Sequence, residues 1–321
     1  MAIDTAKTLT TTVSQAIKNR YYDELFLTIA ESKLVHKQLG QLNRQIEQGS
    51  GGYGTGQVYW TRWSNLPLVT AGQGEGVPTT AVSMTATNVT GSTAQYDAAV
   101  SISDLAAYTS FGDVMKAAIE RLAYNAGLSI DTIVRNTIST AGTLQSATGV
   151  TGAAWTSIPA TGVLNITEIR RAVRTLQRND TQEPDGGFVA VIHPDAEYDL
   201  MGDTTTGGWL DANKYTTAMP MLQGEIGKLY GVRFLETSNA YVRGTGVTST
   251  ATVYVTSVFG KDAFGVTELQ NLKTYVKDFG SGGVSDPTDK VSTAGWKLTF
   301  GAAPLNSNFF VNISHVVSST A

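Results

Sequence analysis

The densest group of side chains that could bind a metal ion or transfer a proton lies in residues 193–199. It combines one imidazole with three carboxylates, from His193, Asp195, Glu197 and Asp199. Imidazoles and carboxylates are common ligands of divalent metal ions. The segment also has the features of a helix start, with proline in the first turn and acidic residues at the positive end of the helix dipole. We favour the helix start and expect no metal ion here.

The other motifs that could support catalysis are incomplete. The triplet Asp278-Phe279-Gly280 resembles a magnesium-binding motif of kinases, but no His-Arg-Asp segment precedes it. The glycine-rich segments 52–56 and 72–76 lack the helix and the lysine that follow a phosphate-binding loop. The chain has no cysteine, which excludes a disulfide framework, an iron–sulfur cluster and a thiol nucleophile. The sequence therefore predicts no catalytic residue and no cofactor, with a hydrolase that uses carboxylates near 195–203 as a weaker alternative.

A run of arginines makes one predicted helix locally basic. Arg170, Arg174 and Arg178 are spaced by four residues, so they share a helix face that could contact phosphate or an acidic partner. The alternative is a solvated face opposite the apolar stripe, and we favour it. The chain has 23 Lys and Arg against 27 Asp and Glu, a net charge of -4. This balance argues against a tight nucleic-acid binder.

The composition of the chain is low in charge. Charged residues make up 16% of its 321 residues, whereas soluble domains average about 25%. Such a surface suits a subunit that is largely covered by others, because interface cores are depleted in charge. A threonine- and serine-rich β protein with a neutral surface would have the same composition. We expect a soluble, non-secreted protein, because no apolar run approaches the length of a membrane span and no signal sequence is evident.

The apolar periodicity predicts an α+β protein with one long helix and an antiparallel sheet. Helices are expected from Tyr21 to the break at Gly49, over 107–140 (about 50 Å) and after a capping box formed by Asn165 and Glu168. Shorter helices are expected at 195–201 and 209–215. The predicted strands are 57–63, 81–87, 95–102, 188–192, 231–236, 251–258, 272–277, 296–300 and 309–313.

The segment 51–100 is predicted to be a projecting β-arm with a flexible tip. The loop from Ser64 to Thr80 is unusually long for a compact domain, which is typical of a binding segment. The arm has too few apolar residues to form a core of its own, so we expect it to lie on an adjacent subunit. The candidate contacts are Tyr59, Trp60, Trp63, Pro67, Pro78 and Tyr96.

A series of peptides in the second half of the chain resembles a known family. They include HPDAEYDL (193–200), GWLDANKY (208–215), GEIGKLYGVRFLETSN (224–239), VFGKDAFGV (258–266), KTYVKDFG (273–280) and STAGWKLTFG (292–301). This series is similar to the major capsid proteins of tailed bacteriophages related to coliphage N-four. The resemblance implies the Hong Kong 97-like capsid fold. Its parts would be an N-terminal arm and helix (1–50), an extended β-arm or E-loop (51–104), a peripheral domain with a spine helix (105–160), an axial domain (161–265) and a return to the peripheral-domain sheet (266–321).

The resemblance also implies a function. Proteins of this family assemble as pentamers and hexamers into an icosahedral shell around double-stranded DNA, without sequence-specific binding to it. A separate scaffolding protein and a portal are expected partners, decoration proteins are left open, and no membrane is involved. The implied location is the virion capsid, and the host cytoplasm during assembly. Arg170, Arg174 and Arg178 become candidate lumenal or electrostatic contacts. The alternative from another class is a secreted or surface β-rich binding module.

Overall fold

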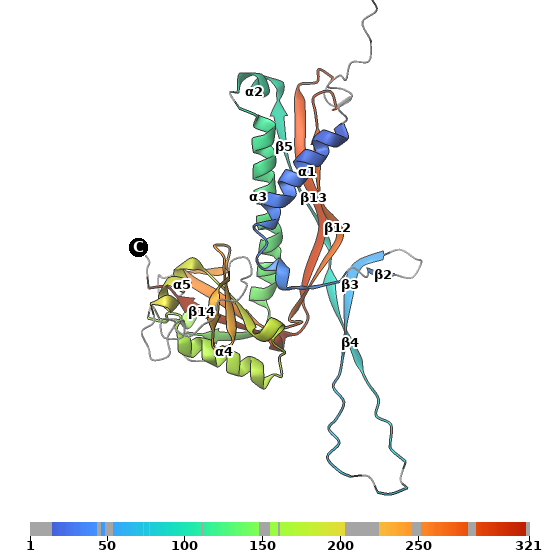
Figure 1. Ribbon diagram of the computed structural model, residues 1–321, viewed down its shortest axis with the longest axis vertical. Coiled ribbons are helices and arrows are strands. Elements are labelled where there is room, and N and C mark those ends of the chain that lie inside the picture. Colours follow the sequence, from blue (N-terminus) through green and yellow to red (C-terminus); the bar gives the residue numbers. More distant parts are fainter. Residues whose placement is uncertain are drawn as a thin grey trace, which may run out of the picture.

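A long helix packed on a four-stranded sheet forms the centre of the molecule (Figure 1). The computed structural model describes residues 15–43, 46–48, 54–72, 74–76, 78–110, 112–147, 155–159, 161–202, 225–245, 252–281 and 287–318. The helix is α3 (Val114–Thr140), and the sheet has the strand order β1 (Gln41–Leu42), β12 (Phe264–Lys277), β13 (Val291–Pro304) and β5 (Ala94–Ser103). Alternate residues of β13 are buried toward the helix, among them Trp296, Leu298 and Phe300. This alternation is the period-2 pattern that the sequence predicted.

Helix α1 (Gln15–Glu31) packs beside α3 and also contacts β12 (Figure 1). Its buried residues Phe26 and Ala30 join the core around α3. This packing includes Gly127, where an added Cβ would lie 2.6 Å from the carbonyl oxygen of Ala30. The only glycine within the α3 periodicity is therefore required for the close approach of the two helices.

Two helix boundaries differ from the sequence prediction. The helix expected from Tyr21 to Gly49 ends at Glu31, and the chain continues through the short 3-10 helix η1 (Lys37–Leu39) into β1. The helix expected over 107–140 is divided into α2 (Asp104–Thr109) and α3, and the Asp113 side chain caps α3 by accepting a hydrogen bond from the Lys116 N–H (3.0 Å). With 27 residues, α3 is about 40 Å long rather than 50 Å.

A buried hydrogen-bonded pair explains the early end of α1. His36 follows the helix, and its backbone N–H and Nδ1 each lie 2.8 Å from an oxygen of Asp131 in α3. Asn239 donates to the same carboxylate from the other side at 3.0 Å. Burial alone would raise the pKa of Asp131, but these hydrogen bonds and the charge of His36 hold it below its ordinary value. The cluster joins the α1–β1 connection, the long helix and the loop before β10.

The second part of the molecule is a seven-stranded sheet that carries helices α4 (Ile166–Arg178) and α5 (Pro194–Met201). Its strand order is β6 (Thr143–Ser146), β14 (Phe310–Val316), β11 (Thr252–Phe259), β7 (Phe188–Ile192), β9 (Val232–Glu236) and β8 (Glu225–Leu229), with β10 (Val242–Thr245) paired to β11. Asn165 caps α4 as the sequence predicted, because its Oδ1 accepts a hydrogen bond from the Glu168 N–H at 3.1 Å. The Glu168 side chain does not complete the capping box, because its carboxylate accepts hydrogen bonds from Gln145 Nε2 and Arg171 Nη1, both at 2.7 Å. The helix expected at 209–215 lies outside the described residues.

The pairing of two strands bears on the expected segments 51–104 and 266–321, which stay predictions. The last strand, β14, does not return to the four-stranded sheet with β12 and β13 but pairs with β11 in the seven-stranded sheet. It also holds the end of the long helix, because the buried Asn312 amide donates to the carbonyls of Ile138 (3.1 Å) and Ser139 (3.2 Å). Strand β5, assigned to the arm in the prediction, is an edge strand of the four-stranded sheet.

The arm is a separate three-stranded sheet that extends away from both parts (Figure 1). It consists of β2 (Ile46–Gln48), β3 (Gly54–Trp63) and β4 (Ala86–Ser92). The predicted strand at 81–87 is misplaced, because pairing with β3 begins only at Ala86 and residues 81–85 are exposed and irregular. None of the described helices is both long and apolar enough to cross a membrane.

Candidate assembly surfaces

The tip of the arm exposes apolar side chains that its own chain does not cover. We define the arm tip as the described residues within 66–84. Leu68 is 90% exposed and Val69 is 85% exposed, and Leu66, Val82 and Met84 are also exposed. The last contact between the two sides is the hydrogen bond from the Ser64 N–H to the Thr85 carbonyl (2.9 Å), and no hydrogen bond joins the two sides within the described tip. Such a surface is typical of a segment that binds another protein surface.

Trp60 packs the base of the arm against the body. Trp60 is only 6% exposed and forms a small core with Val58 and Ala303. Its ring lies on two glycines, since an added Cβ would be 2.4 Å from Cε2 at Gly265 and 2.7 Å from Cζ3 at Gly91. We therefore remove Trp60 from the candidate inter-subunit contacts, because its side chain is already buried within its own chain.

The other candidate contacts of the arm differ in exposure. Trp63, Pro67 and Pro78 are exposed, so they are available to a neighbouring subunit. Tyr59 is half-buried, and its hydroxyl donates to Gln57 Oε1 at 3.1 Å. Tyr96 is also half-buried and packs against the core of the four-stranded sheet. Sequence reasoning missed the more exposed aliphatic side chains of the tip because aromatic residues were given more weight.

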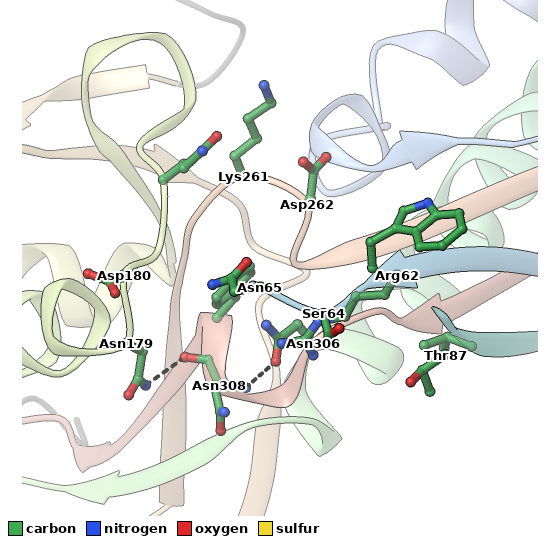
Figure 2. A pocket seen from close by; sticks show the side chains of 14 residues that line it. Arg62, Ser64, Asn65, Thr87, Asn179, Asp180, Lys261, Asp262, Asn306 and Asn308 are labelled. Carbon is green, nitrogen blue, oxygen red and sulfur yellow. Dashed lines mark hydrogen bonds between the residues drawn. The ribbon is translucent and has the colours of Figure 1, made fainter. Parts of the chain in front are cut away.

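A polar groove of about 820 Å³ lies where the arm meets the seven-stranded sheet (Figure 2). Five of its lining residues are amides, namely Asn65, Asn179, Gln182, Asn306 and Asn308. Its four charged residues balance in number, because Arg62 and Lys261 are cations and Asp180 and Asp262 are anions. Two of the amide residues are linked through Asn308: Asn179 Nδ2 donates to its carbonyl at 3.0 Å, and Asn306 Oδ1 accepts from its N–H at 3.2 Å (Figure 2). Sequence reasoning missed this groove, because its walls come from five separate segments.

The predicted arginine face is present on α4. Arg170, Arg174 and Arg178 are exposed, and the Arg170 guanidinium lies 5.5 Å from the centre of the Tyr230 ring. Arg171 points to the other side and forms an ion pair with Glu168 at 2.7 Å. The structure therefore separates one arginine with a carboxylate partner from three arginines on the solvent side.

The segment 193–199 forms a helix start, as favoured from the sequence. His193 is the N-terminal cap of α5, and its Nδ1 accepts a hydrogen bond from the Asp195 N–H at 3.2 Å. The Asp195 carboxylate accepts a hydrogen bond from the Tyr254 hydroxyl at 2.9 Å. Over the described part of the chain, no three side chains of metal-ligating type come together.

A fully buried histidine makes stability depend on pH. Burial lowers the pKa of His315 in β14 from 6.5 to about 4, and its Nε2 lies 3.0 Å from Thr256 Oγ1. The unfolded chain takes up a proton below about pH 6.5, whereas the folded chain does so only near pH 4. We therefore expect the free energy of unfolding of the unassembled subunit to be greatest above pH 6.5 and to fall by roughly 3 kcal/mol from this residue as the pH drops to 4. Denaturant unfolding at pH 7 and pH 5 should show a smaller decrease for His315→Gln, and an equal decrease would contradict this account.

Comparison with known proteins identifies the family to which this chain belongs. The family model described as phage capsid protein matches residues 86–312, which is more than half of the chain. The chain therefore belongs to the phage capsid protein family. A comparison with curated protein sequences finds no match.

Solved capsid structures share the fold over almost the whole chain. The capsid of Ralstonia phage GP4 is 14% identical, with a TM-score of 0.68 and coverage of 91% of each chain. The Cyanophage Pam1 capsid asymmetric unit is 14% identical, with a TM-score of 0.66 and coverage of 88% of this chain and 89% of that one. A chain of Mycobacterium phage Che8 is 17% identical, with a TM-score of 0.57 and coverage of 87% and 90%.

The fold is thus Hong Kong 97-like, as the peptide resemblance implied. The protein is a structural, non-enzymatic phage capsid protein, and its place is the virion capsid. The narrower resemblance to relatives of coliphage N-four stays a prediction.

Proposed function

We infer that copies of this chain form pentamers and hexamers that close into an icosahedral shell around double-stranded DNA, with the arm of each copy on a neighbouring copy. The observation that carries this proposal is the exposed arm tip, where Leu68 and Val69 are almost fully accessible. Burial of apolar surface stabilises an interface by about 25 cal/mol per Å². An arm that extends away from its own body gains this free energy only on another subunit (Figure 1).

Electron microscopy and sedimentation of the purified recombinant protein test this proposal. The complete chain should give pentamers, hexamers or shells, whereas a secreted β-rich binding module would give a monodisperse monomer.

Deletion of Pro67–Pro78 is the sharper measurement. Because none of the described residues in this range belongs to the cores of the two larger sheets, the deleted chain should fold with an unchanged circular dichroism spectrum. Its yield of assembled particles should fall at least tenfold, because the apolar contacts of the tip are lost. Normal particles from the deleted chain would count against the role of the arm.

The remaining partners follow from the same proposal. We expect a separate scaffolding protein and a portal, with assembly in the host cytoplasm, and decoration proteins are left open. The enclosed DNA is held without sequence-specific contacts, in agreement with the acidic balance of the chain.

We also propose that Arg170, Arg174 and Arg178 contact phosphates of the enclosed DNA. They are about 6 Å apart along the helix, and Arg170 is held over Tyr230. Replacing all three by alanine should weaken binding to a short duplex about tenfold or more and lower the salt dependence, as measured by fluorescence anisotropy at two salt concentrations. The matched control replaces Lys273, Lys277 and Lys297, which removes the same charge elsewhere. If the arginine variant binds DNA normally but assembles poorly, the arginines instead contact an acidic surface of another subunit.

A further inference from the structure

We propose that the groove at the base of the arm receives the arm tip of a second copy of this chain. The proposal rests on the assembly proposed above and names the surface that accepts the arm. The groove is the 820 Å³ cavity lined by amides, and it continues into a smaller pocket of about 260 Å³ beside Trp60. The two share five lining residues, including Arg62, Val89 and Phe309.

The chemistry of the tip limits what can bind it. Glu75 is the only charged residue between 66 and 84, so the tip has almost no charge to pair. Its two sides run as irregular, elongated segments in Figure 1, with a turn at Glu75 and Gly76, and no hydrogen bonds join the described residues of the two sides. A segment with unpaired backbone N–H and C=O groups requires hydrogen-bond partners of both kinds when it is covered. Its exposed Leu68 and Val69 require apolar contacts in addition.

The groove supplies these groups. Asparagine and glutamine side chains both donate and accept hydrogen bonds, which matches an extended backbone. The two cations and two carboxylates of the groove cancel, so it attracts neither anions nor cations strongly. Trp63 and Phe309 provide apolar walls, and Leu305 lines the adjoining pocket. A neutral, extended and partly apolar peptide therefore suits this surface better than a phosphate, a metal ion or a nucleic acid.

The position of the groove requires the tip to come from another copy. Figure 1 shows the tip at the far end of the arm, whereas the groove lies at the base beside the strand residues Arg62 and Thr87 (Figure 2). Contact between the tip of one copy and the base of the next is head-to-tail. Head-to-tail contacts close into rings when the rotation allows it, and pentamers and hexamers are such rings.

A disulfide trap tests this contact directly, because the chain has no cysteine of its own. Val69→Cys in the tip combined with Asn308→Cys in the groove should give a ladder of multimers on non-reducing denaturing gels of oxidised particles, and reductant should remove it. The matched control pairs Val69→Cys with Arg174→Cys, which is also exposed but lies on α4. Assembled particles whose tip and groove cysteines cross-link no more than the control pair would overturn the proposal.

A second measurement uses the unmodified chain in case the cysteine variant does not assemble. Hydrogen exchange of particles and free subunits should show protection of backbone amides at 66–84 and 306–308 on assembly. Equal exchange in both states would overturn the proposal, while the assembly itself would stand. If the unmodified chain forms no oligomers at all, the proposed function fails as well, so the two failures are distinguishable.

Discussion

The variant Asp131→Ala is expected to lower the free energy of unfolding of the subunit by about 3 to 5 kcal/mol. Asp131 is completely buried in α3 and accepts hydrogen bonds from the backbone and ring of His36 and from Asn239. Removing the carboxylate leaves the buried backbone N–H and ring of His36 without this acceptor, and an unsatisfied buried polar group carries its full desolvation cost. Three segments distant in sequence also lose their common contact.

Denaturant unfolding of the unassembled subunit measures this effect. Glu120→Ala is the matched control, since it removes a half-buried carboxylate from the same helix and should change the stability by about 0.5 kcal/mol or less. Because the pKa of Asp131 lies below its ordinary value of 3.8, its contribution is present at neutral pH and disappears only as the pH falls through that lowered pKa. A loss below 1 kcal/mol at pH 7 would show that the cluster does not stabilise the fold.

Gly265→Val should abolish particle formation while the subunit stays folded. A Cβ at this position would lie 2.4 to 2.7 Å from three atoms of the Trp60 indole, so the ring must leave its site. Overpacking of a core costs about 1 to 3 kcal/mol, which the two larger cores can tolerate. The arm, however, packs against the body through this small core, so the direction of the arm should change when the Trp60 ring moves.

The effect of this variant is measured as the yield of particles in sedimentation. Tryptophan fluorescence shows whether the environment of the Trp60 ring has changed. Gly112→Ala is the control, because it lies outside the arm and no atom lies within 4 Å of a Cβ at that position. Adding Trp60→Leu to the Gly265 variant should restore part of the yield, since the smaller side chain removes the overlap. Normal particles from Gly265→Val alone would mean that the packing of Trp60 on Gly265 does not determine the direction of the arm.

The sequence by itself determined those helices and strands that depend on residues close together in the chain. The N-cap at Asn165, the buried strand Phe188–Ile192 and the helix start at His193 depend on neighbouring residues, and all three are as expected. The α+β class and the projecting arm also followed from the sequence, because alternation, helix periodicity and a long proline- and glycine-containing loop are properties of single segments.

Only the tertiary structure decided where these segments meet. Trp60 was expected to contact another subunit, but its ring is buried against Gly265 and Gly91. The sequence does not show this contact, because the three residues come together only when distant segments of the chain pack in the fold. Helix α1 ends at Glu31 although apolar residues continue, because His36 is held by Asp131 in another helix. Strand β14 pairs with β11 in the seven-stranded sheet, where both of its faces are buried. The alternation of apolar residues predicts a strand here but does not predict which strand it pairs with. The groove has the same origin: each of its amides is an ordinary polar residue in sequence, and their common surface exists only in the fold.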